Sequence, residues 1–210
     1  NTGTGYDPNN GYDDDLTADY TISGASDDAG CGLHSTPYRY EWDDDGFGSW
    51  TSDTTPSLST SDGDSADADA QIRDKVGNIG NQDGEDIVVD DDAPTGFSVT
   101  VTRDTGYPDY YAYMSGDTIY FNSGENDYIT VQVNNDGTIQ NSGYWRQRCD
   151  VDSVFESAFW DSSSLPDSNN YNYQSDSSGD FKIRIVNNAG NYQEISYTAT
   201  EDTGNPSIDT

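Results

Sequence analysis

Short runs in which apolar and polar residues alternate recur along the chain. One run, at 68–78, reads ADAQIRDKVGN, and another, at 181–191, reads FKIRIVNNAGN. Side chains of a β-strand point to its two faces in turn, so the apolar positions of each run line one face of a strand. No long segment places apolar residues at helical spacing, so the pattern predicts an all-β chain. The apolar positions are Ala68, Ala70 and Ile72 in the first run and Phe181, Ile183 and Ile185 in the second.

The two runs belong to an internal repeat. Further pairs of segments match in the same order at a separation of about 112 residues, and several consistent matches are stronger evidence than any single motif. We therefore predict two tandem domains, residues 1–93 and 94–210. Short strands with turn signals every ~8–12 residues are typical of β-sandwiches, so each domain is predicted to be one. The additional matching pairs are 16–24 with 127–135, 38–42 with 145–149, and 87–95 with 197–207.

Each half carries an Asp/Asn-x-x-Gly-Asn motif between its last two predicted strands. Gly77 and Gly190 supply the positive φ angle that a tight turn needs, so the motif recurs because each domain needs the same late turn. The second half also contains a candidate hairpin at 110–121, which turns at Ser115 and Gly116. Domain 2 is therefore predicted to carry an extra N-terminal hairpin.

The segment SDDAGCGLHSTPYRYEWDDDGFGSW at 26–50, followed by IRDKVGN and VVDDDAPT, resembles the bacterial immunoglobulin-like repeats of prokaryotic surface, adhesin and filament proteins. The first half matches through most of its length, and the second half matches mainly at its two ends. The resemblance implies two tandem immunoglobulin-like β-sandwich domains. It also implies Ca²⁺ at domain junctions, because related repeats often bind calcium there. Such repeats serve as spacers, stalks and binding heads alike, so the fold alone does not give the function.

The charge balance limits the partners. The chain has 34 Asp and 6 Glu against 8 Lys plus Arg, for a formal net charge of −32. Nucleic acid and anionic membrane surfaces are expected to be repelled, and cations are the natural counter-species. No apolar run is long enough to span a membrane, so no membrane insertion is expected. The abundance of Asp and Tyr indicates an extracellular protein at a cell surface.

Clustered oxygen ligands predict calcium. In a sandwich of this kind, two turns meet at the N-terminal pole, and Ca²⁺ takes sets of six to eight oxygen ligands such as Asp and Asn side chains supply. The open alternatives are solvated turn residues and adaptation to high salt. The predicted ligands are Asp27, Asp28 and Asp74 in domain 1, Asp136 and Asn187 in domain 2 beneath the linker Asp90, Asp91 and Asp92, and Glu201 and Asp202 for a following unit.

The sequence offers few candidates for catalytic residues. A glycosidase-type carboxyl pair needs one carboxyl in an apolar pocket that raises its pKa, and Asp-rich turns provide the opposite surroundings. His34 is the single histidine and stands in a polar segment, so we expect no enzyme. Tyrosines at 106–114 and 169–174 could stack on a glycan or pack across strands.

The two cysteines, Cys31 and Cys149, are too few for a disulfide scaffold. A disulfide needs Cα atoms within about 7 Å, which two sandwiches placed end to end would not provide internally. A bond from Cys149 of one molecule to Cys31 of the next is one hypothesis. Two free thiols, or an internal bond in a folded-back arrangement, are the alternatives.

These observations predict a non-enzymatic extracellular structural protein, a subunit of a surface filament or a segment of a stalk, made rigid by Ca²⁺ at its domain junctions. Its partners would be copies of itself in head-to-tail assembly or neighbouring repeats of a longer chain. The alternative is an adhesin-type module that recognises a glycan or receptor through the Tyr-rich loops of domain 2.

Overall fold

The described residues form strands joined by turns, bends and irregular segments, with no helix among them, which confirms the all-β prediction. The structure is a computed structural model. Among the residues that it describes, there is no helix long and apolar enough to cross a membrane. It describes residues 11–14, 16–27, 30–80, 83–103, 112–124, 127–151, 154–155, 160–161, 164–174 and 176–208.

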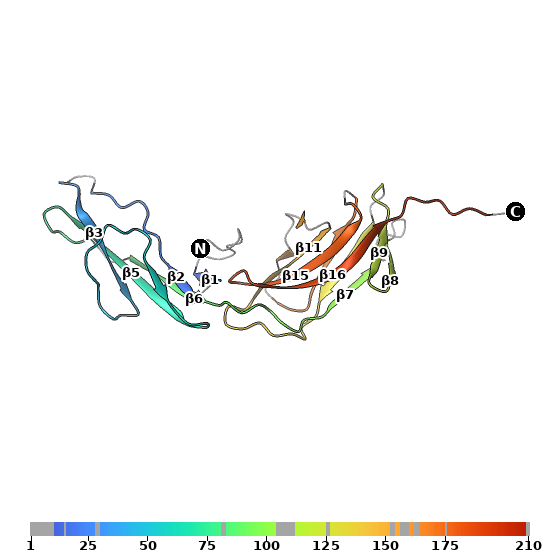
Figure 1. Ribbon diagram of the computed structural model, residues 1–210, viewed down its shortest axis with the longest axis horizontal. Helices are drawn as coiled ribbons and strands as arrows, with labels where there is room; N and C mark the ends of the chain where they lie inside the picture. Colours follow the sequence, from blue (N-terminus) through green and yellow to red (C-terminus); the bar gives the residue numbers. More distant parts are fainter. Residues whose placement is uncertain are drawn as a thin grey trace. The chain divides into compact units, whose positions relative to one another are not determined.

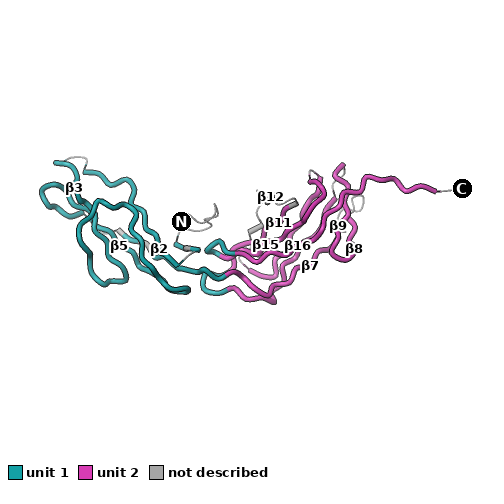
Figure 2. Tube along the Cα trace, viewed as in Figure 1, with its two compact units in different colours: residues 1–92, 140–143, 188–191 teal, residues 93–139, 144–187, 192–210 magenta. Residues whose placement is uncertain are grey.

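The chain forms two compact units, shown in different colours in Figure 2. Unit 1 comprises residues 1–92 together with 140–143 and 188–191, and unit 2 comprises 93–139, 144–187 and 192–210. Two short segments from the second half of the chain thus belong to unit 1. The division into domains at 93/94 stays a prediction, because unit 1 also takes in these two segments of the second half.

Unit 1 contains a four-stranded sheet in the order β1-β6-β5-β3 and a two-stranded sheet of β2 and β4. β3 and β5 pair antiparallel, and β1 pairs in parallel with β6 (Figure 1). Alternation along β5 places Ala66, Ala68 and Ala70 inward, as its sequence pattern predicts. The strands are β1 (Tyr12–Asp13), β2 (Thr17–Asp19), β3 (Leu33–Trp42), β4 (Ser57–Ser59), β5 (Ser65–Asp74) and β6 (Asp83–Val89).

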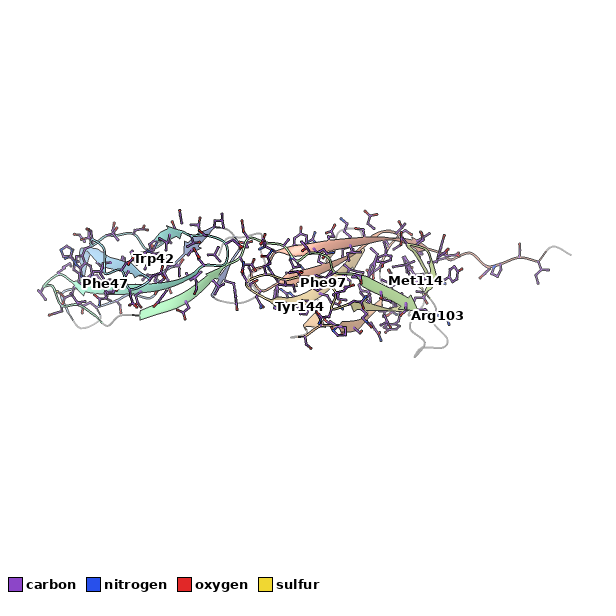
Figure 3. The ribbon with its side chains drawn as sticks, turned by 90° about the horizontal axis from the view of Figure 1, so that it is seen from below. Trp42, Phe47, Phe97, Arg103, Met114 and Tyr144 are labelled. Atoms are coloured by element: carbon purple, nitrogen blue, oxygen red, sulfur yellow. The ribbon has the colours of Figure 1, made fainter. Side chains whose placement is uncertain are left out.

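The core of unit 1 is built largely from small side chains. Ala18, Ala66 and Ala68 are buried with Ile87 and Val89. Larger side chains pack around this group, and Trp42, labelled in Figure 3, is one of them. Because three alanines bury little apolar area, the surrounding larger side chains supply much of the apolar surface that this unit removes from water.

Unit 2 contains a three-stranded sheet in the order β14-β10-β7 and a larger sheet in the order β12-β11-β15-β16-β9-β8, in which β13 also pairs with β11. β8 and β9 form a hairpin around Gly116, within the predicted segment 110–121, whose residues 110 and 111 lie outside the described part. The strands are β7 (Val99–Arg103), β8 (Tyr113–Ser115), β9 (Thr118–Phe121), β10 (Tyr128–Val133), β11 (Tyr144–Val151), β12 (Val154–Phe155), β13 (Trp160–Asp161), β14 (Asp167–Asn172), β15 (Gly179–Asn187) and β16 (Tyr192–Glu201).

Aromatic rings fill the core of unit 2. Tyr173 stacks on Phe121 with ring centroids 4.5 Å apart and lies 5.7 Å from Phe181. A second cluster joins Phe97 to Val133 and Ile185; Phe97 is labelled in Figure 3. This core is larger than that of unit 1, because Phe and Ile stand where unit 1 has Ala.

Strand topology repeats between the two halves. The order β9-β16-β15-β11 repeats β1-β6-β5-β3, and the pair β10-β14 repeats β2-β4. The first strand of each series also runs parallel to the last strand of its half. The structure therefore confirms the internal repeat.

Candidate functional site

Two turns meet at one place in each half, and their backbones share two features. Gly32 and Gly143 both have positive φ, at 84° and 76°, and each begins the segment before a long strand. The main-chain N–H of Lys75 donates to the carbonyl of Gly32, and the N–H of Asn188 donates to that of Gly143. We call 30–32 with 74–78 the first turn pair and 140–143 with 187–191 the second turn pair. Within them, Cys31 corresponds to Ser142 and Asn78 to Asn191.

Three groups that can bind a metal meet at the first turn pair: Cys31 and Asp74 within it, and Asp27 just before it. Carboxylate oxygens of Asp27 and Asp74 and the Sγ of Cys31 all lie within 4.8 Å of one another. Asp27 and Asp74 were predicted as ligands, and the fold brings them together. Asp28, the third predicted ligand at this pole, lies outside the described residues.

Asp74 is tied into its own turn. Its carboxylate accepts hydrogen bonds from the main-chain N–H groups of Val76 and Asn78, at 2.9 and 2.8 Å, and from the Asn78 side chain. Desolvation raises the pKa of Asp74, but these hydrogen bonds outweigh it and hold that pKa below the ordinary value. The Asp74 carboxylate is therefore held in one orientation and favoured in its charged form.

The surroundings of Asp27 and Asp74 fit a weak oxygen site. They border an open cleft of about 270 Å³, which Asn78 also lines. Two carboxylates offer at most four of the six to eight oxygens that Ca²⁺ takes, so water would complete the shell. Lys75 supplies a competing positive charge beside this loop. Its Nζ lies next to Gly32, 3.2 Å from the position that a Cβ atom on that residue would take. Cys31 adds nothing for Ca²⁺, which prefers oxygen.

Asp90, a predicted ligand, is instead an internal hydrogen-bond acceptor of unit 1. Its side chain is fully buried, and Oδ2 accepts hydrogen bonds from the main-chain N–H of Ser142, at 2.9 Å, and from the Ser142 hydroxyl. Oδ1 accepts from the N–H of Asp92, and the carbonyl of Asp90 accepts from the side chain of Asn191. These bonds count against Asp90 as a calcium ligand, because they already occupy its carboxylate.

The neighbouring carboxylates crowd one another. Asp62 accepts from the N–H of Asp91 and from the side chain of Asn141. Desolvation raises the pKa of Asp92, and the nearby charges of Asp62, Asp91 and Asp90 raise it further. The linker carboxylates Asp91 and Asp92 are therefore placed beside Asp62, which was not among the predicted ligands.

The predicted ligands Asp136 and Asn187 have different surroundings. Asp136 is exposed and accepts hydrogen bonds from the N–H and the hydroxyl of Ser98, which lower its pKa. Asn187 is fully buried at the end of β15. This burial counts against Asn187 as a ligand for an ion at the surface.

Glu201 and Asp202 lie exposed at the end of β16. Glu201 accepts a hydrogen bond from the hydroxyl of Ser123. Oδ1 of Asp202 accepts from the N–H of Gly204 at 3.0 Å, which is the same two-residue cap that Asp90 forms with Asp92. The end of the second half thus repeats the turn that follows β6.

Both cysteines are free thiols, Cys31 exposed and Cys149 buried. Cys149 packs in the main core of unit 2, where burial raises its pKa well above the ordinary value. This position counts against the hypothetical Cys149–Cys31 bond between molecules, because another molecule would have to reach into the core.

The tyrosines of the segment 169–174 face inward. Tyr171 is 3% exposed, Tyr173 is fully buried, and both belong to the core. They cannot stack on a glycan, which corrects that part of the adhesin alternative. Of the segment 106–114, residues 106–111 lie outside the described part, and Tyr113 is exposed beside Tyr120.

Sequence reasoning missed the partners of Asp90. Ser142 precedes a positive-φ glycine just as Cys31 does, and Asn191 closes its motif just as Asn78 does. Alignment of the two halves could have marked both residues. Their bond to Asp90 spans 52 and 101 positions and leaves no local pattern.

Comparisons with known proteins bear on the fold. No protein-family model matches the sequence, and no curated protein matches it either. Fibronectin(III)-like modules of CbhA from Clostridium thermocellum match with a TM-score of 0.54 at 9% identity, over 95% of this chain and 93% of that one. The Bacteroides ovatus protein SGBP-B of the mixed-linkage glucan utilization locus, in complex with a mixed-linkage heptasaccharide, matches at 11% identity with a TM-score of 0.27, over 90% of this chain and 42% of that one. The first match shows that the chain has the fold of tandem fibronectin type III-like modules, β-sandwiches of the immunoglobulin-like kind.

Proposed function

We propose that this chain is a non-enzymatic, extracellular structural segment, part of a surface filament or stalk. The observation that carries the proposal is the duplicated topology: the same strand order and the same turn pair occur in both halves. Repeated modules whose surfaces match from one copy to the next suit a linear array, since contacts that repeat without closing produce filaments.

Calcium has a reduced part in this proposal. The site that the described residues favour is the first turn pair, with Asp27 and Asp74 as ligands. Two exposed carboxylates and water give a weak site, in the range of about 10⁻⁴–10⁻³ M found for extracellular modules. Such a site fills outside a cell and stays empty inside one.

The structural role is tested by negative-stain electron microscopy and a glycan array on the same preparation. We expect strings of particles at high protein concentration with millimolar CaCl₂ in ~1 M KCl, and no binding to the array. Isolated particles that bind one glycan class would overturn the structural role and favour the adhesin alternative.

The calcium site is tested by thermal unfolding with CaCl₂, with EGTA, and with KCl at matched ionic strength. We expect a stabilisation by CaCl₂ beyond that of KCl, because the ion binds the folded state only. Asp74→Asn should abolish the excess, and it copies the residue that the second half has at this place, Asn187. Asp136→Asn serves as the matched control. Equal stabilisation by CaCl₂ and KCl would instead indicate general charge screening.

A further inference from the structure

One contact inside the chain joins an acceptor residue, Asp90, to two donor residues of the second turn pair. Both the acceptor and the donors have counterparts at the repeated positions of the chain. In unit 1, the carboxylate of Asp90 sits on the second turn pair, where Ser142 donates to Oδ2 and Asn191 donates to the carbonyl. Burial of this carboxylate is complete, so the contact excludes water. Hydrogen bonds to a charged acceptor are about twice as strong as neutral ones, which makes this a specific attachment.

Asp202 repeats the acceptor half of this contact. It follows β16 as Asp90 follows β6, and its Oδ1 caps the N–H two residues on. A proline stands four positions later in both cases, Pro94 and Pro206. Among the described residues, nothing hydrogen-bonds to Oδ2 of Asp202, the atom that in Asp90 receives Ser142.

The first turn pair repeats the donor half. Cys31 stands where Ser142 stands, ahead of a glycine with the same positive φ, and Asn78 stands where Asn191 stands. Cys31 is exposed, and none of the described residues accepts a hydrogen bond from its main-chain N–H. Its thiol donates weakly to the carbonyl of Gly32 at 3.7 Å, and Asp27 accepts from the N–H of Gly32 at 2.8 Å. The Asn78 side chain uses one N–H on Asp74 and has a second to offer.

We propose that Asp202 of one molecule binds the first turn pair of a second copy of this chain, head to tail, as Asp90 binds the second turn pair. Oδ2 of Asp202 accepts from the main-chain N–H of Cys31 and from its thiol, which turns away from the Gly32 carbonyl that it meets in the single molecule. The carbonyl of Asp202 accepts from Asn78. The proposal rests on the proposed function and names the surfaces through which the array would grow.

The two versions of the contact differ in charge, and this sets the conditions for binding. Asn187 and Asn188 of the second turn pair are neutral, whereas Asp74 and Lys75 stand at these positions in the first. Asp27 adds a further carboxylate near Cys31. A third carboxylate from Asp202 would meet like charges there, so the joint forms at high salt, where the Debye length falls to about 3 Å in ~1 M KCl.

Disulfide trapping tests the geometry with the native thiol as one reporter. We expect Asp202→Cys, oxidised mildly in ~1 M KCl, to give a ladder of linked molecules on a non-reducing gel, with mass spectrometry identifying Cys31 joined to the introduced cysteine. The ladder should disappear in the double variant Asp202→Cys with Cys31→Ser. Ser196→Cys, exposed on β16, the strand that Asp202 follows, reports random collisions. Absence of the ladder, or equal cross-linking of Ser196→Cys, overturns the proposal.

Sedimentation velocity of the reduced protein supplies an independent measure without new thiols. Asp202→Ala should weaken self-association roughly tenfold, because it removes a charged acceptor. Cys31→Ser, which copies Ser142, should strengthen association roughly threefold to tenfold, because a hydroxyl is a better donor than a thiol. Opposite or absent effects overturn the joint.

The outcomes separate this joint from the proposed function. Filaments that persist in Asp202→Ala would refute the joint and leave the structural role standing, with assembly through another surface. Wild-type protein that stays monomeric in every salt condition and forms no strings would refute both.

Discussion

Single aspartates in this acidic chain have opposite surroundings. Asp74 is held below its ordinary pKa by hydrogen bonds from its own turn. Asp150 is fully buried on β11, and desolvation raises its pKa to about 6, against the partial opposition of the Lys182 main chain and of the charges of Lys182 and Arg184. Identical side chains therefore contribute to stability with opposite signs as the pH changes.

The Asp150 carboxyl gives a pH-dependent prediction. Its pKa is 3.8 in the unfolded chain and about 6 in the folded one, so the stability gained from the neutral form is present in full below pH 3.8 and is lost as the pH rises through 6. Asp150→Asn should match wild type near pH 4 and melt roughly 2–4 °C higher at pH 8. Differential scanning calorimetry across this range checks the crossover.

The control for this measurement is Asp180→Asn on the neighbouring strand β15, which removes an exposed carboxylate and the same formal charge. A difference from wild type that is constant with pH would contradict a titrating Asp150.

At the scale of strands and turns, much of the fold could be predicted. The alternating pattern places Ala68 and Phe181 on the buried faces of their strands, as the structure confirms. Gly77 and Gly190 do adopt positive φ, at 92° and 104°. The parallel pairing of β1 with β6 could not be predicted, because β1 is two residues long and has no period to read.

The candidate site was predictable only in part. Asp27 and Asp74 were found because the two turns were expected to meet at one pole. Cys31 was placed at the same pole but was not counted as a metal ligand. The burial of Asn187 was not foreseen, because a polar residue at a strand end looks exposed in the sequence. Burial depends on packing from distant segments, which local pattern does not contain.

The aromatic core of unit 2 carries an element-scale prediction. Tyr173 is buried between Phe121 and Phe181, and its hydroxyl has no hydrogen-bond partner among the described residues. Tyr173→Phe should leave stability unchanged or raise it slightly, since it removes a desolvated hydroxyl. Tyr173→Ala should cost about 3–5 kcal/mol through the cavity it leaves. Urea unfolding followed by fluorescence measures both; a large loss in Tyr173→Phe would show that the hydroxyl is bonded.

For the whole molecule, charge dominates. A net charge of −32 makes the folded chain repel itself, and salt screens this repulsion. Raising KCl from about 10 mM to about 1 M shortens the Debye length from ~30 to ~3 Å, so the melting temperature should rise steadily over this range. NaCl should act equally, because screening depends on ionic strength alone. A rise confined to one cation would indicate bound ions instead of screening.

The interleaving of unit 1 has a consequence for how the protein is made. During translation, Asp90 leaves the ribosome well before Asn191, which lies 101 positions further along the chain. At about 5–20 residues per second, that interval lasts roughly 5–20 s. Until Ser142 and then Asn191 have been made, the nascent first sandwich offers Asp90 only the main-chain N–H of Asp92, and water must take the place of the other donors. Its final closure is thus a late event in synthesis, timed by the second half of the polypeptide.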